Sequence, residues 1–173
     1  MTRKKKICML GSSAVGKTSL VRRFVKGIYS DRYISTIGVK IERKDVRVAS
    51  HDLTMMLWDL HGEDDVTAVR ASYLRASSGG LLVADGTRAY TVDRLRTLRE
   101  RMVSVVGEIP LVLVLNKSDL AEAWDIDEEG DALAGLDDLP RIKTSALDGT
   151  GVGSAFELLG RGILRAEGLL PDA

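Results

Sequence analysis

The chain has 173 residues, of which 45% are hydrophobic, so it is long enough to bury the core of one domain. Its 25 basic and 25 acidic residues cancel, which argues against general nucleic-acid binding, because such binding usually needs a basic excess. No apolar run approaches the roughly 20 residues that span a bilayer. The single cysteine, Cys8, lies in an apolar run, so we expect a buried thiol and a cytoplasmic protein.

The two ends of the sequence carry no signal for lipid attachment. Residue 2 is Thr rather than Gly, which argues against myristoylation, and no cysteine lies near the C-terminus for prenylation, so we expect no lipid anchor. The basic run at residues 3–6 has two interpretations. It could contact anionic lipid, or it could be a solvated entrance to a strand that discourages aggregation at a sheet edge. Stable anchoring usually needs two signals, so the second interpretation is favoured.

Short apolar runs alternate with longer amphipathic segments along the chain. In chain order they predict strand 7–10, helix 19–25, a charged edge strand 40–48, strands 53–60 and 80–84, helix 92–106, strands 111–115 and 142–144, and helix 152–167. This alternation favours a single α/β domain over residues 1–173, with an open, mostly parallel sheet of about six strands and helices on both faces. Ligands of such sheets bind at the carboxyl ends of the strands.

Residues 11–18 read G-S-S-A-V-G-K-T and lie between a predicted strand and a predicted helix. This is the pattern and context of a phosphate-binding loop (P-loop), whose backbone N–H groups and helix N-terminus surround phosphate oxygens. A turn that merely contains glycines is the alternative, and the placement argues against it. We expect Lys17 to reach the β- and γ-phosphates and the Thr18 hydroxyl to bind magnesium. The other expected nucleotide contacts are Ser13, Ala14, Val15, Gly16 and Ser19.

Residues 116–119 read N-K-S-D and follow the aliphatic strand at 111–115, which places them at the same edge of the sheet as the P-loop. The Asp119 carboxylate can accept hydrogen bonds from N1–H and the exocyclic amino group of guanine. Adenine has an acceptor and no amino group there, so it would leave the carboxylate unpaired. Lys117 can lay its stem over the base, and Asn116 opens the motif. Together with the P-loop, the motif indicates a guanine nucleotide.

From about residue 5 to residue 167 the sequence resembles the Ras/Rab superfamily of small GTPases, with that superfamily's guanine-nucleotide motifs in order. The resemblance implies that Ser145, Ala146 and Leu147 form a third base-contact loop, where a backbone N–H meets guanine O6. Leu147 replaces the more usual lysine, which is tolerable because the backbone makes that contact. The resemblance also implies that Tyr29 stacks at the edge of the base.

Residues 33–38 read Y-I-S-T-I-G and resemble switch I of Rab proteins. The resemblance implies that Tyr33 closes over the phosphates, and that Thr36 binds magnesium and senses the γ-phosphate. In the region that resembles switch II, Asp59 is retained and would hold magnesium through water, and the N–H of Gly62 would contact the γ-phosphate. Loss of that phosphate would release both loops, which is how such a protein works as a switch.

Residues 58–63 read W-D-L-H-G-E in place of the superfamily's W-D-T-A-G-Q, so Glu63 stands where a glutamine positions the attacking water. An ionised glutamate cannot donate a hydrogen bond, and its charge opposes the phosphoryl oxygens. It could instead act as a general base, or be protonated through repulsion from Asp64 and Asp65. His61 replaces a small residue and could obstruct closure, supply an N–H or point into solvent. We therefore expect slow hydrolysis, which a partner's arginine would accelerate by roughly 10³–10⁵.

Three functions compete for these motifs. The first is a GTP-hydrolysing switch with Lys17, Thr36, Gly62 and Glu63 as catalytic residues and with guanine nucleotide and magnesium bound. The second is a GTP-binding interaction module that barely hydrolyses. The third is a P-loop kinase for a small metabolite, but this leaves the N-K-S-D motif unexplained and lacks an obvious basic lid.

For the first two functions the expected partners are an effector, an exchange factor and an activating protein at the switch regions and strand 40–48. Tyr73 and Leu74 would add an apolar patch to this surface, although a core role suits Leu74 equally well. Three arginines are candidates for structural or partner contacts rather than for an internal catalytic arginine: Arg70, Arg75 and Arg88.

Overall fold

The structure is a computed structural model that describes residues 2–30, 38–60 and 69–172. In chain order its elements are β1 (Arg3–Leu10), α1 (Lys17–Lys26), β2 (Val39–Val48), β3 (His51–Leu60), α2 (Ala71–Leu74), β4 (Gly79–Asp85), α3 (Tyr90–Val106), β5 (Leu111–Asn116), the 3₁₀ turns η2 (Ala121–Ala123) and η3 (Asp131–Leu133), β6 (Arg141–Thr144) and α4 (Val152–Ala166). These elements include every strand and helix that the sequence predicts.

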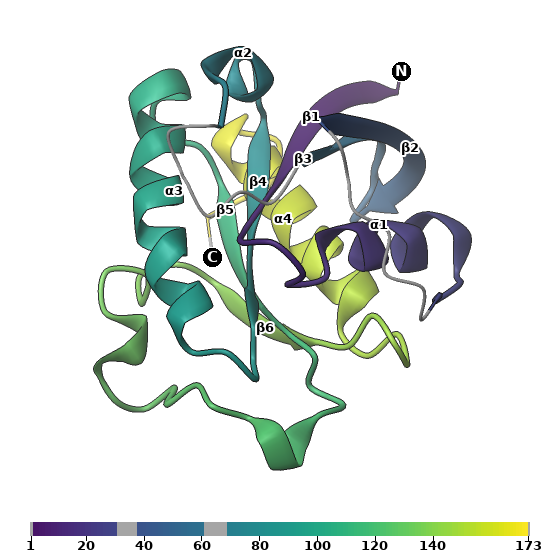
Figure 1. Cartoon of the computed structure of the whole chain (residues 1–173). Coiled ribbons are helices and arrows are strands. Elements are labelled where there is room, and N and C mark those ends of the chain that lie inside the picture. Colours follow the sequence, from purple (N-terminus) through teal and green to yellow (C-terminus); the bar gives the residue numbers. More distant parts are fainter. Residues whose placement is uncertain (1, 31–37, 61–68, 173) are drawn as a thin grey trace.

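The strands of the described chain form one six-stranded sheet in the order β2-β3-β1-β4-β5-β6 (Figure 1). β1 pairs in parallel with β3 and β4, and β5 pairs in parallel with β4 and β6. β2 and β3 pair antiparallel as a hairpin, which leaves β2 at the edge of the sheet, as predicted. The expected α/β fold with a mostly parallel sheet is therefore confirmed.

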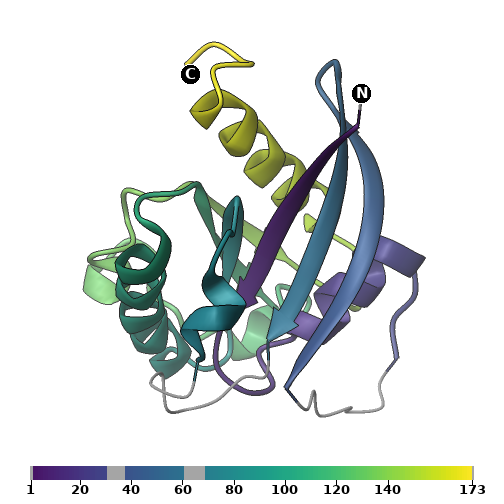
Figure 2. The same ribbon diagram turned by 90° about the horizontal axis from the view of Figure 1, so that it is seen from above.

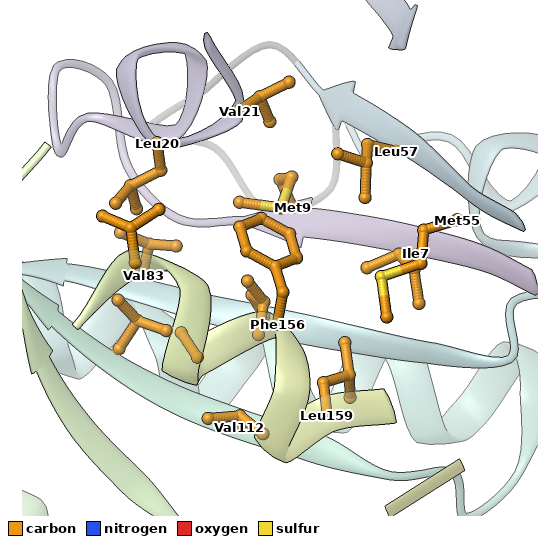
Figure 3. Close-up of a cluster of buried hydrophobic side chains, with 14 of the residues drawn as sticks. Ile7, Met9, Leu20, Val21, Met55, Leu57, Val83, Val112, Phe156 and Leu159 are labelled. Carbon is orange, nitrogen blue, oxygen red and sulfur yellow. The ribbon is translucent and has the colours of Figure 1, made fainter. Parts of the chain in front are cut away.

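Helices cover both faces of this sheet. α1 and α4 lie on one face, and α2 and α3 lie on the other (Figures 1 and 2). The hydrophobic core between the sheet and helices α1 and α4 is centred on Phe156 of α4, which lies among Met9, Leu20 and Val83 (Figure 3). The ring of Phe24 stacks on Phe156 with 3.8 Å between the ring centroids. Every residue of β4 and β5 is buried, since helices cover both of their faces, and their sequences are correspondingly apolar.

The basic run at residues 3–6 opens β1 and pairs there with β3 alone, because β4 pairs with β1 only from Ile7 onward. Arg3 and Lys4 are exposed, which agrees with the interpretation as a solvated strand entrance, whereas Lys5 and Lys6 are not. Lys5 is only 8% exposed and forms an ion pair with Glu167, just after α4. Lys6 donates to the carbonyl of Arg75 at 2.8 Å, and its ammonium lies 3.7 Å from the centroid of a Trp58 ring. These lysines are therefore structural parts of a central strand.

Cys8, for which the sequence predicts burial, and Leu74, for which it allows a surface or a core position, are both buried. Cys8 is fully buried, as expected, with its Sγ 3.1 Å from Ser77 Oγ, and burial raises the pKa of its thiol. Leu74 is also fully buried, so it belongs to the core and not to an apolar surface patch. Tyr73, its neighbour on α2, is half-buried. None of the described helices is both long enough and apolar enough to cross a membrane.

The crossover at residues 117–140 joins two parallel strands, β5 and β6, without an α-helix. The second 3₁₀ turn, η3, and the residues after it are held against α3 by arginine side chains that donate to backbone carbonyls. Arg96 reaches Ala132 at 2.7 Å, and Arg99 reaches Gly135 at 2.8 Å. The crossover matters for function because the candidate base-binding residues begin at its first residues and resume after β6.

Candidate nucleotide site

The P-loop runs from the end of β1 into α1, as the motif requires. Gly16 is the N-cap of α1 in a left-handed conformation, with φ 104°. A Cβ on Gly11 would lie 2.3 Å from the carbonyl oxygen of Val83, so this position has no room for a side chain. The loop therefore turns sharply into α1, whose first N–H groups have no acceptor within the helix itself.

Lys17 lies inside the P-loop and is 6% exposed. Its ammonium donates to the carbonyls of Gly11 at 2.8 Å and Ser12 at 2.9 Å. Burial lowers the pKa of Lys17 to about 8, although the nearby carboxylate of Asp59 opposes this shift. A bound phosphate would restore favourable surroundings to the charge, so the arrangement suits an anion.

Thr18 and Asp59 bring two oxygen ligands together beside Lys17. The Thr18 hydroxyl donates to Asp59 Oδ2 at 2.6 Å, and Asp59 is 1% exposed. Magnesium prefers oxygen ligands at about 2.0–2.1 Å and keeps several of its waters. A hydroxyl and a carboxylate at this spacing, next to a phosphate site, therefore fit a magnesium ion.

Asn116 joins the P-loop to the base-recognition motif. Its Nδ2 donates to the carbonyl of Val15 at 3.0 Å, and its Oδ1 accepts from Thr144 Oγ1 at 2.9 Å. The side chain is 2% exposed, so these bonds form away from water. Ser118 N–H also donates to the carbonyl of Thr144 at 3.0 Å. The P-loop, the end of β5 and the end of β6 are thus fixed to one another.

The residues expected to contact a base lie at the same edge of the sheet. Ser145 is fully buried, and its hydroxyl donates to Asp119 Oδ1 at 2.7 Å, which orients the carboxylate. Ala146 is 4% exposed, whereas the side chains of Tyr29 and Leu147 are 40% and 49% exposed. An oriented carboxylate, followed in the same loop by the exposed apolar side chain of Leu147, is the kind of surface that a planar base could cover.

Asp85, at the end of β4, is a buried residue of this site that the sequence motifs do not include. Its Oδ2 lies 2.7 Å from Lys117 Nζ and 2.8 Å from Arg88 Nε. Burial alone would raise the pKa of Asp85, but hydrogen bonds from Lys117, Thr87 and Arg88 outweigh it and hold the pKa below its usual value. Arg88 also donates to the carbonyl of Ser13 at 3.1 Å, so it is a structural contact, as expected.

Of the predicted site residues, the structure brings together those of the P-loop, the N-K-S-D motif, the loop at 145–147 and Asp59. Tyr29 lies just beyond α1, and its expected stacking on a base stays a prediction. The remaining predicted site residues fall outside the described parts of the chain, and so do the three residues near Glu63 that are expected to influence it. These residues are Tyr33, Thr36, His61, Gly62, Glu63, Asp64 and Asp65. Their expected roles stay predictions.

The close approach of Gly16 to Asn116 gives a first prediction. A Cβ on Gly16 would lie 2.3 Å from Asn116 Nδ2, so Gly16→Ala should displace the amide that joins the two loops. We expect it to lower the free energy of unfolding by about 1–2 kcal/mol through backbone strain and by about 1–3 kcal/mol through the lost buried bond. Urea denaturation without nucleotide measures this loss.

Gly27→Ala is the matched control for Gly16→Ala. Gly27 also has a positive φ, 67°, but a Cβ added to it would have no atom within 4 Å. The control therefore suffers the backbone strain alone, about 1–2 kcal/mol. Equal losses for the two variants would contradict the role given to Asn116.

Comparison with known proteins agrees with this geometry. The model of the Ras family matches residues 6–165. The P-loop, the Thr18–Asp59 pair beside it and the oriented carboxylate of Asp119 fit a guanine-nucleotide-binding protein. The chain belongs to the Ras family, and as a member it is a GTP-binding switch GTPase.

Similar curated proteins include several plant and algal Rab proteins. The chain is 35% identical over 156 residues to Ras-related protein RABA5e of Arabidopsis thaliana, which covers 89% of this chain and 72% of the relative. It is 36% identical over 160 residues to RABA5b of the same plant, covering 91% and 74%. It is 34% identical over 154 residues to Ras-related protein YPTC6 of Chlamydomonas reinhardtii, covering 88% and 71%.

Proposed function

We propose that residues 1–173 act as one domain that binds magnesium and GTP and hydrolyses GTP slowly unless a partner assists. The observation that carries this proposal is the Asn116 bridge, which joins the P-loop to the end of β6, next to the hydrogen bond between Ser145 and Asp119. A kinase for a small metabolite would have no use for the Ser145–Asp119 pair beside that bridge.

The P-loop would hold the phosphates through the N–H groups of Ser13 to Ser19 and through the Lys17 ammonium. Lys17 is already desolvated, so its charge would act strongly on the β- and γ-phosphate oxygens. Thr18 and Asp59 would hold magnesium, the latter through water, and Thr36 would complete this set in the GTP state. When bound, magnesium would neutralise part of the charge that develops on the phosphate oxygens.

The guanine base would lie between the N-K-S-D motif and the loop at residues 145–147. The Asp119 carboxylate would accept hydrogen bonds from N1–H and the amino group of guanine. The hydrogen bond from the Ser145 hydroxyl to Oδ1 would keep the carboxylate in position. The stem of Lys117 would cover one side of the ring, since Asp85 anchors its ammonium. Tyr29 would close the edge of the base, and Tyr33 would close over the phosphates.

Slow hydrolysis follows from Glu63. The attacking water must be oriented while the transferred phosphoryl oxygens receive hydrogen bonds, and an ionised carboxylate can do only the first. Gly62 would still supply its N–H to the γ-phosphate. The second candidate function, a GTP-binding interaction module that hydrolyses little, rests on this same substitution.

Single-turnover hydrolysis of magnesium-GTP by the wild type and by Glu63→Gln tests this proposal. We expect the variant to be faster by at least about 10-fold, because one donor to a transition-state oxygen is worth about 10²–10³. Glu157→Gln, an exposed carboxylate on α4, is the control for charge removal and should leave the rate unchanged.

The outcomes of this experiment separate the two candidate functions. A faster variant beside a wild type with measurable turnover makes Glu63 a brake on an active GTPase. A faster variant beside a wild type that binds GTP tightly with negligible turnover favours the interaction module. A wild type at least as fast as the variant would mean that Glu63 takes part in a different catalytic arrangement, and the proposal of slow hydrolysis would be wrong.

Family membership also implies regulators and effectors. We propose that an effector, an exchange factor and an activating protein bind at the switch regions and at β2. The outward side of β2 carries Ile41, Arg43 and Asp45, and Ile41 is 45% exposed. An apolar side chain among charges on an edge strand is suited to a protein partner.

A further inference from the structure

We propose that Arg23 of α1 is a positioning residue that holds the loop at residues 145–147 in its guanine-binding shape, and so sets how long the nucleotide stays bound. The observation behind this is the set of backbone acceptors that one guanidinium reaches. Arg23 Nε donates to the carbonyl of Ala146 at 2.9 Å, and its Nη2 donates to the carbonyl of Leu147. This inference rests on the proposed base-contact role of that loop.

Arg23 is itself anchored at the end of its helix. It lies in the last turn of α1, and its Nη1 donates to the carbonyl of Gly27 at 3.2 Å, the residue that caps the helix. α1 lies beside α4 on the same face of the sheet, and the 145–147 loop leads into α4 (Figure 1). A planar guanidinium with three directions of donation can therefore join the two segments, and the three bonds fix its orientation.

The peptide geometry shows what these bonds control. A peptide unit is planar, so the unit that carries the carbonyl of Ala146 also carries the N–H of Leu147. Arg23 fixes that plane. The preceding plane carries the carbonyl of Ser145 and the N–H of Ala146, and it is fixed separately, because Gly149 N–H donates to the Ser145 carbonyl at 2.8 Å. The directions of both N–H groups available to guanine O6 are thereby set, the second of them by Arg23.

The same bonds compensate for the loop's lack of regular structure. Residues 145–147 lie between β6 and α4, and the loop ends at Gly149 and Gly151, both with positive φ. Hydrogen bonds from a charged donor to a carbonyl are stronger than neutral ones. Without Arg23 the Ala146–Leu147 peptide unit would be free to rotate, and its N–H would no longer point at the base. The nucleotide would then dissociate faster, and the increase would depend on the hydrogen bond to guanine O6.

The test compares dissociation of two nucleotides that carry a fluorescent group on the ribose, GDP and 6-thio-GDP. Sulfur is a weak acceptor, so 6-thio-GDP keeps the contacts to Asp119 but has already lost most of the contact at position 6. We expect Arg23→Ala to release GDP roughly 10- to 100-fold faster than the wild type, and to release 6-thio-GDP faster by a clearly smaller factor. Arg23→Lys should fall between, because one ammonium cannot serve three carbonyls.

Arg22→Ala is the matched control. Arg22 is the preceding residue of the same helix with the same charge, and it interacts electrostatically with Glu42 of β2 instead. We expect its GDP dissociation rate to stay within about twofold of the wild type. Thermal unfolding monitored by circular dichroism shows whether each variant is folded, and Arg23→Lys carries the test if Arg23→Ala is not.

Two results would overturn the inference. One is a GDP dissociation rate for both Arg23 variants within about twofold of the wild type. The other is an equal acceleration for GDP and 6-thio-GDP, which would indicate a general loosening of the domain. Failure of the wild type to retain GDP would instead overturn the proposed function, and with it the inference.

Discussion

Lys17→Met is expected to lower the affinity for magnesium-GDP by about 10²–10⁴-fold, which isothermal titration calorimetry can measure. The physical reason is that the ammonium of Lys17 is desolvated inside the P-loop, where removing one partner of a charge pair costs about 3–5 kcal/mol. We expect the variant to fold without nucleotide. It loses the bonds to the carbonyls of Gly11 and Ser12, but it also avoids burying a charge whose pKa burial has lowered to about 8.

Lys5→Met is the control for this experiment. Lys5 is also a buried lysine, but its partner is Glu167 and it lies away from the P-loop, early in β1. Its loss should lower the free energy of unfolding and leave the affinity for GDP unchanged. Near-wild-type affinity for Lys17→Met would mean that the P-loop does not hold phosphates in the way proposed here.

Asp119→Asn is expected to change which base the protein accepts. The variant loses an acceptor for N1–H and for the amino group of guanine, so its affinity for GDP should fall on the order of 10²-fold or more. Xanthine carries an oxygen in place of the amino group, and the asparagine amide can donate to it. We therefore expect the variant to prefer xanthosine diphosphate, which competition between the two nucleotides would measure.

The structure makes Asp119→Asn a sharp test, since the asparagine Oδ1 can still accept the hydrogen bond from Ser145 that orients the wild-type carboxylate. Glu122→Gln, an exposed carboxylate in the neighbouring turn η2, is the control for loss of a negative charge. If the variant still prefers GDP to xanthosine diphosphate, the proposal that Asp119 binds the guanine base is wrong.

Most of the fold can be predicted from the sequence, because strands buried on both faces have continuous apolar runs and the long helices have apolar residues at helical spacing. The predicted bounds of β5 and α3 agree with the structure to within two residues at either end. The sequence does not reveal α2, because its four residues are too few to show a helical period. Nor does it reveal the first half of β1, whose lysines are charged, since a charge pattern does not show that Lys5 meets Glu167 from the other end of the chain.

In the candidate site, too, some residues can be predicted from the sequence and others cannot. The P-loop and the N-K-S-D motif are contiguous, and each has one spacing that serves its chemistry, so the sequence predicts them. Asp85 carries a weak signal, since it follows a buried strand at the same edge of the sheet as Asn116. Arg23 carries none, because its bonds to the 145–147 loop go to carbonyls more than 100 residues along the chain, and every residue has a backbone carbonyl whatever its side chain.

Asn116 holds the P-loop and the end of β6 together through bonds that lie wholly within the protein. Ordering a loop costs conformational entropy, and a ligand that must order its own binding site loses that amount of affinity at every encounter. For the P-loop and the residues at the end of β6, this entropy is lost when the domain folds and not again when the nucleotide binds. An arriving nucleotide therefore meets both ends of its site at a fixed separation, and its residence time depends on the contacts it breaks on leaving.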